Sequence, residues 1–310
     1  MNRLLVPILV LLLTIPIGLR AQLDPVSLAL RAYQSKEYTK AQELIDIAVA
    51  DEKFNTTART WLFRGYIYKD MYKLERTGPN GQEQRANAIS SFQKTMELDT
   101  EKEFDNDCIP SLKFLGSTLF NDAATALDQS EFDEAQSYYN DYKELTLVTN
   151  PNIDFSARDV EFKLYKASKL SLIYELAEAD TDLASPAQEL KSVLRIDATG
   201  AAIIKLYEEV IALDSNNVSA NYNLGIHYYN QGVNMIDNLD YELPFEELFA
   251  VQEKVMELFT MALPYMLKAY ELDPTRKATL QGLSGIYFGL NDIEQSEYYQ
   301  LELDKLNSNQ

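Results

Sequence analysis

The sequence predicts an all-α protein built from repeated pairs of helices. From Leu23 onward, apolar residues recur at spacings of three and four, as on one face of a helix, and no segment alternates as a strand would. The 11 Gly and 10 Pro fall mostly between these stretches, where helices would end. Similar segments then reappear along the chain, which is typical of repeat architectures.

Two short patterns recur, one in the first helix of a pair and one at the end of the second. The first-helix pattern occurs three times, as Trp61-x-x-Arg64-Gly65-x-x-Tyr68, Asn221-x-x-Leu224-Gly225-x-x-Tyr228 and Leu280-x-x-Leu283-Ser284-x-x-Tyr287. The second-helix endings are Phe92 to Asp99, Tyr207 to Asp214 and Met266 to Pro274. Both patterns resemble the tetratricopeptide repeat family, in which a small residue at the eighth position lets the paired helices approach closely.

The resemblance implies a right-handed superhelical solenoid of helix-turn-helix repeats, with the first helix of each repeat lining a concave surface. Setting the patterns in register gives six repeats after residue 21, at about 22–55, 58–102, 116–149, 155–215, 218–274 and 277–304. We interpret the acidic stretch from Asp99 to Asp107 as a solvated linker rather than a calcium site, because it lacks the Gly-bearing spacing of a calcium loop.

Three of the repeats depart from the family spacing. Gly65 and Ala88 lie 23 positions apart instead of 12, so the second repeat carries 11 extra residues. Gly225 and Ala262 lie 37 positions apart, an excess of 25, which predicts elongated helices in the fifth repeat. The fourth repeat is the least regular, with an extra segment at about 185–200.

Residues 1–21 resemble a secretory signal peptide. Arg3 precedes an apolar run from Leu4 to Ile17, and Ala21 ends a passable cleavage site. The alternative is a retained anchor, although the run is shorter than the ~20 residues of a spanning helix. We therefore expect an exported protein, periplasmic or extracellular, with no membrane insertion after cleavage.

Composition argues against several classes of function. The net charge of -20 repels nucleic acid and anionic membranes, and it favours a basic partner. His227 and Cys108 are the only residues of their types, so the chain offers little for a His/Cys metal site or a nucleophile–His pair. We interpret His227 as a packing residue and Cys108 as a buried thiol. The sequence predicts no enzyme activity, no cofactor and no metal.

The resemblance also implies where a partner would bind, at positions 2, 5, 9, 12 and 13 of each first helix. The candidate groove residues are Arg59, Leu62, Tyr66 and Lys69 in the second repeat, Phe120 in the third, and Tyr222, Ile226, Tyr229 and Asn230 in the fifth. The same positions also include Asp70 in the second repeat, Ser117, Ala124, Leu127 and Asp128 in the third, and Ser219 in the fifth. Members that grip a C-terminal carboxylate carry Lys and Asn at positions 5 and 9, which this chain lacks.

We therefore interpret the chain as a non-catalytic scaffold that binds a protein or peptide segment along the concave face, with aromatic anchors. The alternative is a glycan- or envelope-binding helical-repeat module of nutrient uptake or cell-envelope assembly. A hydrolase built on helices is a third reading, which the absent nucleophile–His pair disfavours.

Overall fold

The computed structural model describes residues 24–179 and 186–308, and in these residues every regular element is a helix. The predicted all-α class is confirmed. The chain divides into two compact parts, which we call the N-terminal part, up to Thr118, and the C-terminal part, from Leu119 onward. The predicted leader at 1–21 lies outside the described residues.

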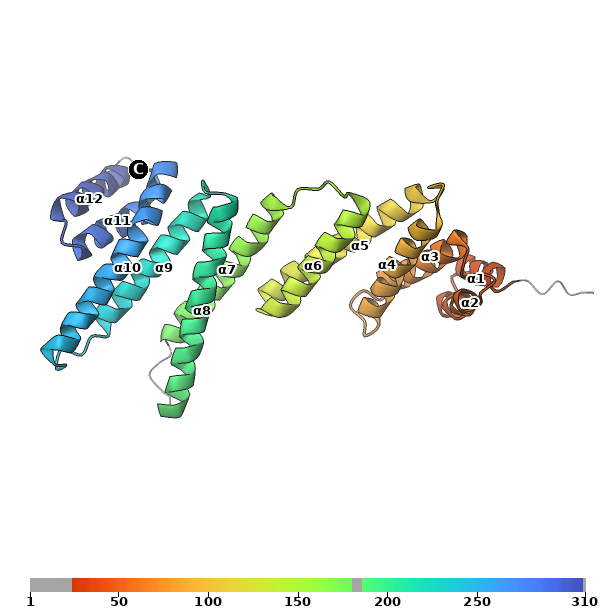
Figure 1. The fold of residues 1–310 in the computed structure, drawn as a ribbon, viewed down its shortest axis with the longest axis horizontal. Helices are drawn as coiled ribbons and strands as arrows, with labels where there is room; N and C mark the ends of the chain where they lie inside the picture. The colour runs from red at the N-terminus through yellow and green to blue at the C-terminus, as the bar shows by residue number, and fades with distance from the viewer. Residues whose placement is uncertain (1–23, 180–185, 309–310) are drawn as a thin grey trace, which may run out of the picture. The chain divides into compact units, whose positions relative to one another are not determined.

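Helices follow one another as antiparallel pairs in both parts (Figure 1). The N-terminal part holds α1 (Pro25–Gln34), α2 (Tyr38–Ala50), α3 (Ala58–Leu74) and α4 (Gly81–Leu98). Helix α5 (Asp105–Asp128) carries residues of both parts. The C-terminal part continues with α6 (Phe132–Thr149), α7 (Ser156–Ala179), α8 (Pro186–Leu213), α9 (Val218–Asp237), α10 (Phe245–Leu272), α11 (Lys277–Gly289) and α12 (Ile293–Ser308).

Three of the turns within pairs share one backbone conformation. Lys36, Ser130 and Asn291 have φ angles of 61°, 63° and 62°, in the left-handed region. The residue after each donates its N–H to a carbonyl five residues earlier, with N···O distances of 2.9 Å (Glu37 to Ala32), 2.8 Å (Glu131 to Ala126) and 2.9 Å (Asp292 to Tyr287). This is the Schellman ending of a helix. Each of the three residues is the fifteenth from the predicted repeat starts at 22, 116 and 277.

Close helix contacts form at the small residues of the repeated pattern. A Cβ placed on Gly65 would lie 2.8 Å from the Phe92 ring, and one on Gly225 would lie 2.6 Å from Cγ of Met266. Phe92 and Met266 are fully buried. The first helix of these pairs therefore approaches the second at the glycine that the pattern predicts.

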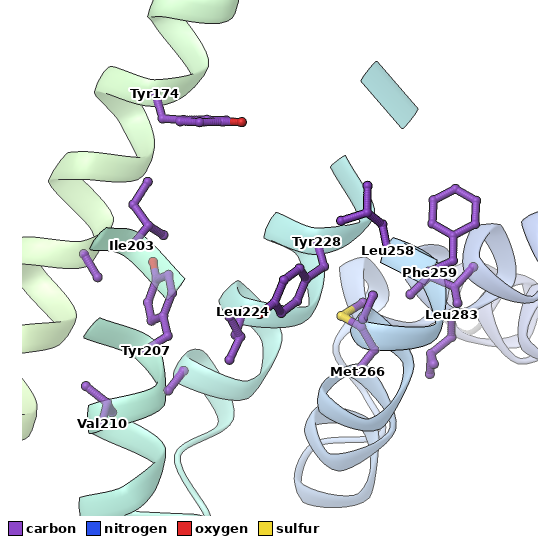
Figure 2. Close-up of a cluster of buried hydrophobic side chains, with 14 of the residues drawn as sticks. Tyr174, Ile203, Tyr207, Val210, Leu224, Tyr228, Leu258, Phe259, Met266 and Leu283 are labelled. Carbon is purple, nitrogen blue, oxygen red and sulfur yellow. The ribbon is translucent and has the colours of Figure 1, made fainter. Parts of the chain in front are cut away.

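The interior of the C-terminal part runs from one helix pair into the next (Figure 2). Tyr207 of α8, Leu224 of α9, Met266 of α10 and Leu283 of α11 belong to one buried cluster. Each pair thus covers its apolar face with the neighbouring pair, as repeat architectures require.

Part of the predicted acidic linker is helical instead. Asp105 and Asp107 lie in the first turn of α5, so the linker interpretation was wrong for them, and the first helix of the third pair begins well before residue 116. Acidic residues are favourable at a helix N-terminus, because the helix dipole is positive there. The described residues of the predicted extra segment at 185–200 form the first half of α8.

A candidate binding hollow

A hollow of about 560 Å³ opens between the first helices of three successive pairs in the C-terminal part. Helices α5, α7 and α9 supply its walls. The lining residues are Phe120, Ala124, Leu127, Asp128, Glu161, Phe162, Leu164, Tyr165, Ser168, Ser219 and Asn223. This volume lies in the range of sites that hold a small ligand or a few side chains of a peptide.

The apolar side of the hollow rests on aromatic rings that are fixed from behind. The Phe120 ring lies 5.2 Å from the Tyr142 ring, centroid to centroid, and Phe162 stacks on Tyr139 at 4.1 Å. Tyr139 in turn donates a hydrogen bond to Asp159, with an O···O distance of 2.7 Å. Because these rings are held by their neighbours, the apolar surface is already formed before any ligand enters.

The polar side is built around Asp128, the last residue of α5. Its carboxylate accepts a hydrogen bond from the Tyr165 hydroxyl and lies 3.0 Å from the Lys169 ammonium. The hydrogen bond from Tyr165, followed by that from Lys169, lowers the pKa of Asp128 below its ordinary value. The carboxylate is therefore ionised at neutral pH. Glu161, Ser168, Ser219 and Asn223 add further hydrogen-bonding groups to the walls.

Four of the five third-repeat candidates meet in this hollow, whereas Ser117 does not line it and donates its hydroxyl to the Phe114 carbonyl. Phe120 lines it, together with Ala124, Leu127 and Asp128 from the same predicted positions. From the fifth repeat, Ser219 also lines it. These residues stand on two different helices, α5 and α9, and the predicted positions bring them to one site.

The second-repeat candidates do not form an open groove surface together. Leu62 is only 4% exposed, so its assignment to the groove was wrong; its side chain has no polar atom and gains most by entering the core. Arg59 is exposed, with its guanidinium 5.6 Å from the Phe63 ring. Tyr66 and Lys69 are half-buried and have their polar ends in internal hydrogen bonds.

The contacts of Tyr66 and Lys69 tie α3 to the start of α5 within the N-terminal part. The Tyr66 hydroxyl donates to Asp107, and the Lys69 ammonium donates to Ser111 at 3.0 Å while lying 4.4 Å from the Tyr66 ring. Burial, and then the hydrogen bond to Asp107, raise the pKa of Tyr66 above its ordinary value. These two side chains are engaged in helix packing.

The fifth-repeat aromatic candidates pack toward α11. The Tyr222 ring lies 3.8 Å from the Arg276 guanidinium, and the Tyr229 hydroxyl fills the space beside Gly285. Ile226 lies beside Gly282 in the same way, and Asn230 is half-buried. None of these four lines the hollow.

The sequence did not predict the wall that α7 contributes to the hollow. Its residues are Glu161, Phe162, Leu164, Tyr165 and Ser168. The fourth repeat is irregular, so no groove positions were assigned to it. The available signal was the aromatic pair Phe162 and Tyr165, three residues apart on a helix that follows directly after the best-preserved repeat.

Neither Cys108 nor His227 is among the residues that line the hollow. Cys108 is fully buried, and burial, followed by the charges of Asp107 and Asp105, raises the pKa of its thiol to about 12. His227 is 8% exposed with its ring edge-on to Tyr174, and burial lowers its pKa to about 4. Among the described side chains, no group of three His, Cys, Asp or Glu residues is arranged to hold a metal ion. No helix in the described ranges has both the length and the apolar character to cross a bilayer.

No protein-family model and no curated protein matches the chain. Among solved structures it is similar to the MamA protein, with 16% identity, a TM-score of 0.30, and coverage of 79% of this chain and 92% of that one. It is also similar to a monomeric IFIT1 mutant with Gppp-AAAA (14% identity, TM-score 0.37) and to the human IFIT1 dimer with m7Gppp-AAAA (14% identity, TM-score 0.36). Both comparisons cover 89% of this chain, which spans only 58% of the IFIT1 chain. Such low identities and TM-scores support no inference about what this chain binds.

Proposed function

We propose that the protein is a non-catalytic scaffold that binds a segment of a partner protein in the hollow between α5, α7 and α9. The observation that carries the proposal is the composition of the walls: a preformed aromatic surface beside exposed hydrogen-bonding groups. Binding sites for peptides combine apolar pockets for side chains with polar groups that fix the main chain.

The preferred segment carries one apolar side chain next to a basic one. The apolar side chain fits against Phe120, Leu127 and Phe162, where it leaves water. The basic side chain suits Glu161, which is exposed, and the overall charge of -20 draws a basic segment toward the protein. The proposed site is therefore formed by the first helices of the third, fourth and fifth pairs, and the tyrosines of the second and fifth repeats are not part of it.

Export to the periplasm or the extracellular space is part of the same proposal. It rests on the leader-like sequence of residues 1–21 alone. Expression of the full chain in a bacterial host, followed by N-terminal sequencing of the protein in the periplasmic fraction, tests it. Cleavage after Ala21 supports export, whereas an intact N-terminus in the cytoplasm counts against it.

Selection of random peptides displayed on phage tests the binding proposal. The Ala124→Trp variant fills the hollow, because Ala124 is half-buried and lines it. Ala212→Trp is the matched control, since Ala212 is exposed in the last turn of α8. We expect peptides selected on the wild type to bind the Ala212→Trp protein equally and the Ala124→Trp protein at least about tenfold more weakly.

Equal binding to all three proteins would show that the peptides sit elsewhere and would refute the proposal. A glycan array run with the same proteins separates the alternative function. If no peptide is selected, and if glycan binding is lost only in Ala124→Trp, the ligand of the hollow is a carbohydrate and not a peptide segment.

A further inference from the structure

A second surface of the C-terminal part exposes aromatic side chains that the fold does not use. It lies where α9 turns into α10, and we call residues 237–257 the aromatic tip. Tyr241 is 76% exposed, Phe245 80% and Phe249 51%. The rings of Phe245 and Phe249 lie 6.4 Å apart at an angle of 26°, so the first turns of α10 present one continuous aromatic stripe. Exposed aromatic clusters of this kind mark interaction sites on soluble proteins.

The aromatic tip extends beyond the neighbouring helix pair. Phe259 fills the space beside Gly289, the last residue of α11, so α11 ends at the level of Phe259. Phe245 precedes Phe259 by 14 residues, which corresponds to about 21 Å along a helix. Figure 1 shows the loop end of α9 and α10 reaching past α11 and α12. This reach comes from the 25 residues that the fifth pair has in excess of the family spacing.

The charge around the stripe is strongly one-sided. Seven acidic residues lie in the aromatic tip, namely Asp237, Asp240, Glu242, Glu246, Glu247, Glu253 and Glu257. The single basic residue is Lys254, whose ammonium lies 2.9 Å from the Glu257 carboxylate. The stripe is therefore bordered by negative charge, which repels anionic membranes and nucleic acids and attracts a basic surface.

We propose that the aromatic tip is a second docking surface, and that it binds a protein whose apolar stripe is edged by Lys and Arg, as on a basic amphipathic helix. Aromatic anchors gain by leaving water, and the acidic border selects the partner and speeds its approach. The proposal does not depend on the hollow, because the two surfaces share no residue.

Fluorescence anisotropy with defined synthetic helices tests this surface. The probe is a labelled amphipathic helix of Leu and Lys, compared with one in which Glu replaces every Lys and one in which Ser replaces every Leu. The Phe245→Ser/Phe249→Ser variant removes the stripe and keeps every charge. We expect the Leu/Lys helix to bind the wild type, the other two helices to fail, and the variant to lose about tenfold or more in affinity.

Matched controls separate the stripe from general charge attraction and from the hollow. Phe288→Ser removes another exposed aromatic, 68% exposed on α11, and should leave affinity within about twofold of the wild type. Ala124→Trp should leave it unchanged as well, even if the hollow binds nothing. If circular dichroism shows that the double variant does not fold, Tyr241→Ser takes its place, because Tyr241 lies outside the helices. We expect this variant to lose less affinity for the Leu/Lys helix than the double variant.

Two results would overturn the proposal. One is an unchanged affinity of the stripe variant, which would leave only non-specific charge attraction. The other is sedimentation of the wild type, but not of the stripe variant, with zwitterionic phosphatidylcholine vesicles, which would make the aromatic tip a membrane contact. Physiological salt should weaken the binding of the Leu/Lys helix to the wild type without abolishing it, because salt screens the acidic border and leaves the aromatic contacts.

Discussion

At the scale of single residues, tight packing depends on glycines that face large rings. Gly65 lies against the Phe92 ring so closely that a methyl group would overlap it. Phe92 is fully buried and its ring lies edge-on to Tyr66 at 5.6 Å, so it has little room to move. The absence of a side chain at residue 65 therefore sets the distance between α3 and α4.

Gly65→Ala tests this contact. Alanine favours a helix over glycine by about 1 kcal/mol. Overpacking against a rigid ring costs about 1–3 kcal/mol, so we expect a net loss in the free energy of unfolding. Urea titration followed by circular dichroism measures it. In a Phe92→Leu background the same change should cost less, and a stabilised Gly65→Ala protein would contradict the packing argument.

His227 offers a second test at this scale, because it is the only histidine of the chain. Burial lowers its pKa to about 4 from an ordinary 6.5, so folding favours the neutral ring. The resulting stabilisation is complete above pH 6.5 and is lost as the pH falls through 6.5 toward 4. An NMR titration of the single imidazole Cε1–H signal should give a pKa well below 6.

His227→Gln removes this dependence and keeps a polar partner for Gln231, whose amide nitrogen lies 3.1 Å from Nε2 of the histidine. Between pH 7 and 5 the wild type should lose stability more steeply than His227→Gln. An imidazole pKa of 6.5 or above, or equal slopes for the two proteins, would show that the ring is not buried as described.

At the scale of elements, the same turn joins the two helices within each of three pairs. Lys36, Ser130 and Asn291 all adopt the left-handed conformation, which costs a residue with a side chain about 1 kcal/mol or more. Glycine adopts it without this cost, and asparagine with less. The structure therefore predicts opposite effects of glycine at the turn and within the helix that follows.

Ser130→Gly should raise the free energy of unfolding by about 0.5–1 kcal/mol, since the strain at the turn is relieved. Ser137→Gly, at an exposed position inside α6, should lower it by about 0.5 kcal/mol through helix propensity alone. Thermal denaturation of the two variants beside the wild type compares them. Destabilisation by both would mean that the turn is not strained.

The same elements show which residues of the candidate site the sequence could predict and which it could not. Phe120, Ala124 and Leu127 were placed on the binding face because the third pair follows the family spacing without interruption. The α7 wall was not, because the register of the fourth pair is broken by the long first half of α8. For Tyr66, the direction of the side chain depends on Asp107, 41 residues away, which no local pattern reveals.

At the scale of the whole molecule, charge is the dominant property. The net charge of -20 makes the folded chain repel itself, while surface pairs such as Lys40–Glu37 contribute little because both side chains are more than half exposed. Added salt screens the repulsion over distances beyond about 10 Å.

We therefore expect the melting temperature to rise between low and physiological salt, in both sodium chloride and potassium chloride. Differential scanning calorimetry measures it. A melting temperature that falls with salt would mean that the ion pairs outweigh the self-repulsion.

The central claim is that a partner segment lies in the hollow between α5, α7 and α9. Photo-crosslinking tests this claim most directly, because it measures which position of the protein lies beside the bound peptide. The crosslinking residue p-benzoylphenylalanine is placed at Ser168 in the hollow wall or at Ala212 on α8. Mass spectrometry then maps the attachment of a peptide selected on the wild type. The account predicts crosslinks from position 168 and none from position 212; equal crosslinking from both positions, or from 212 alone, would contradict it.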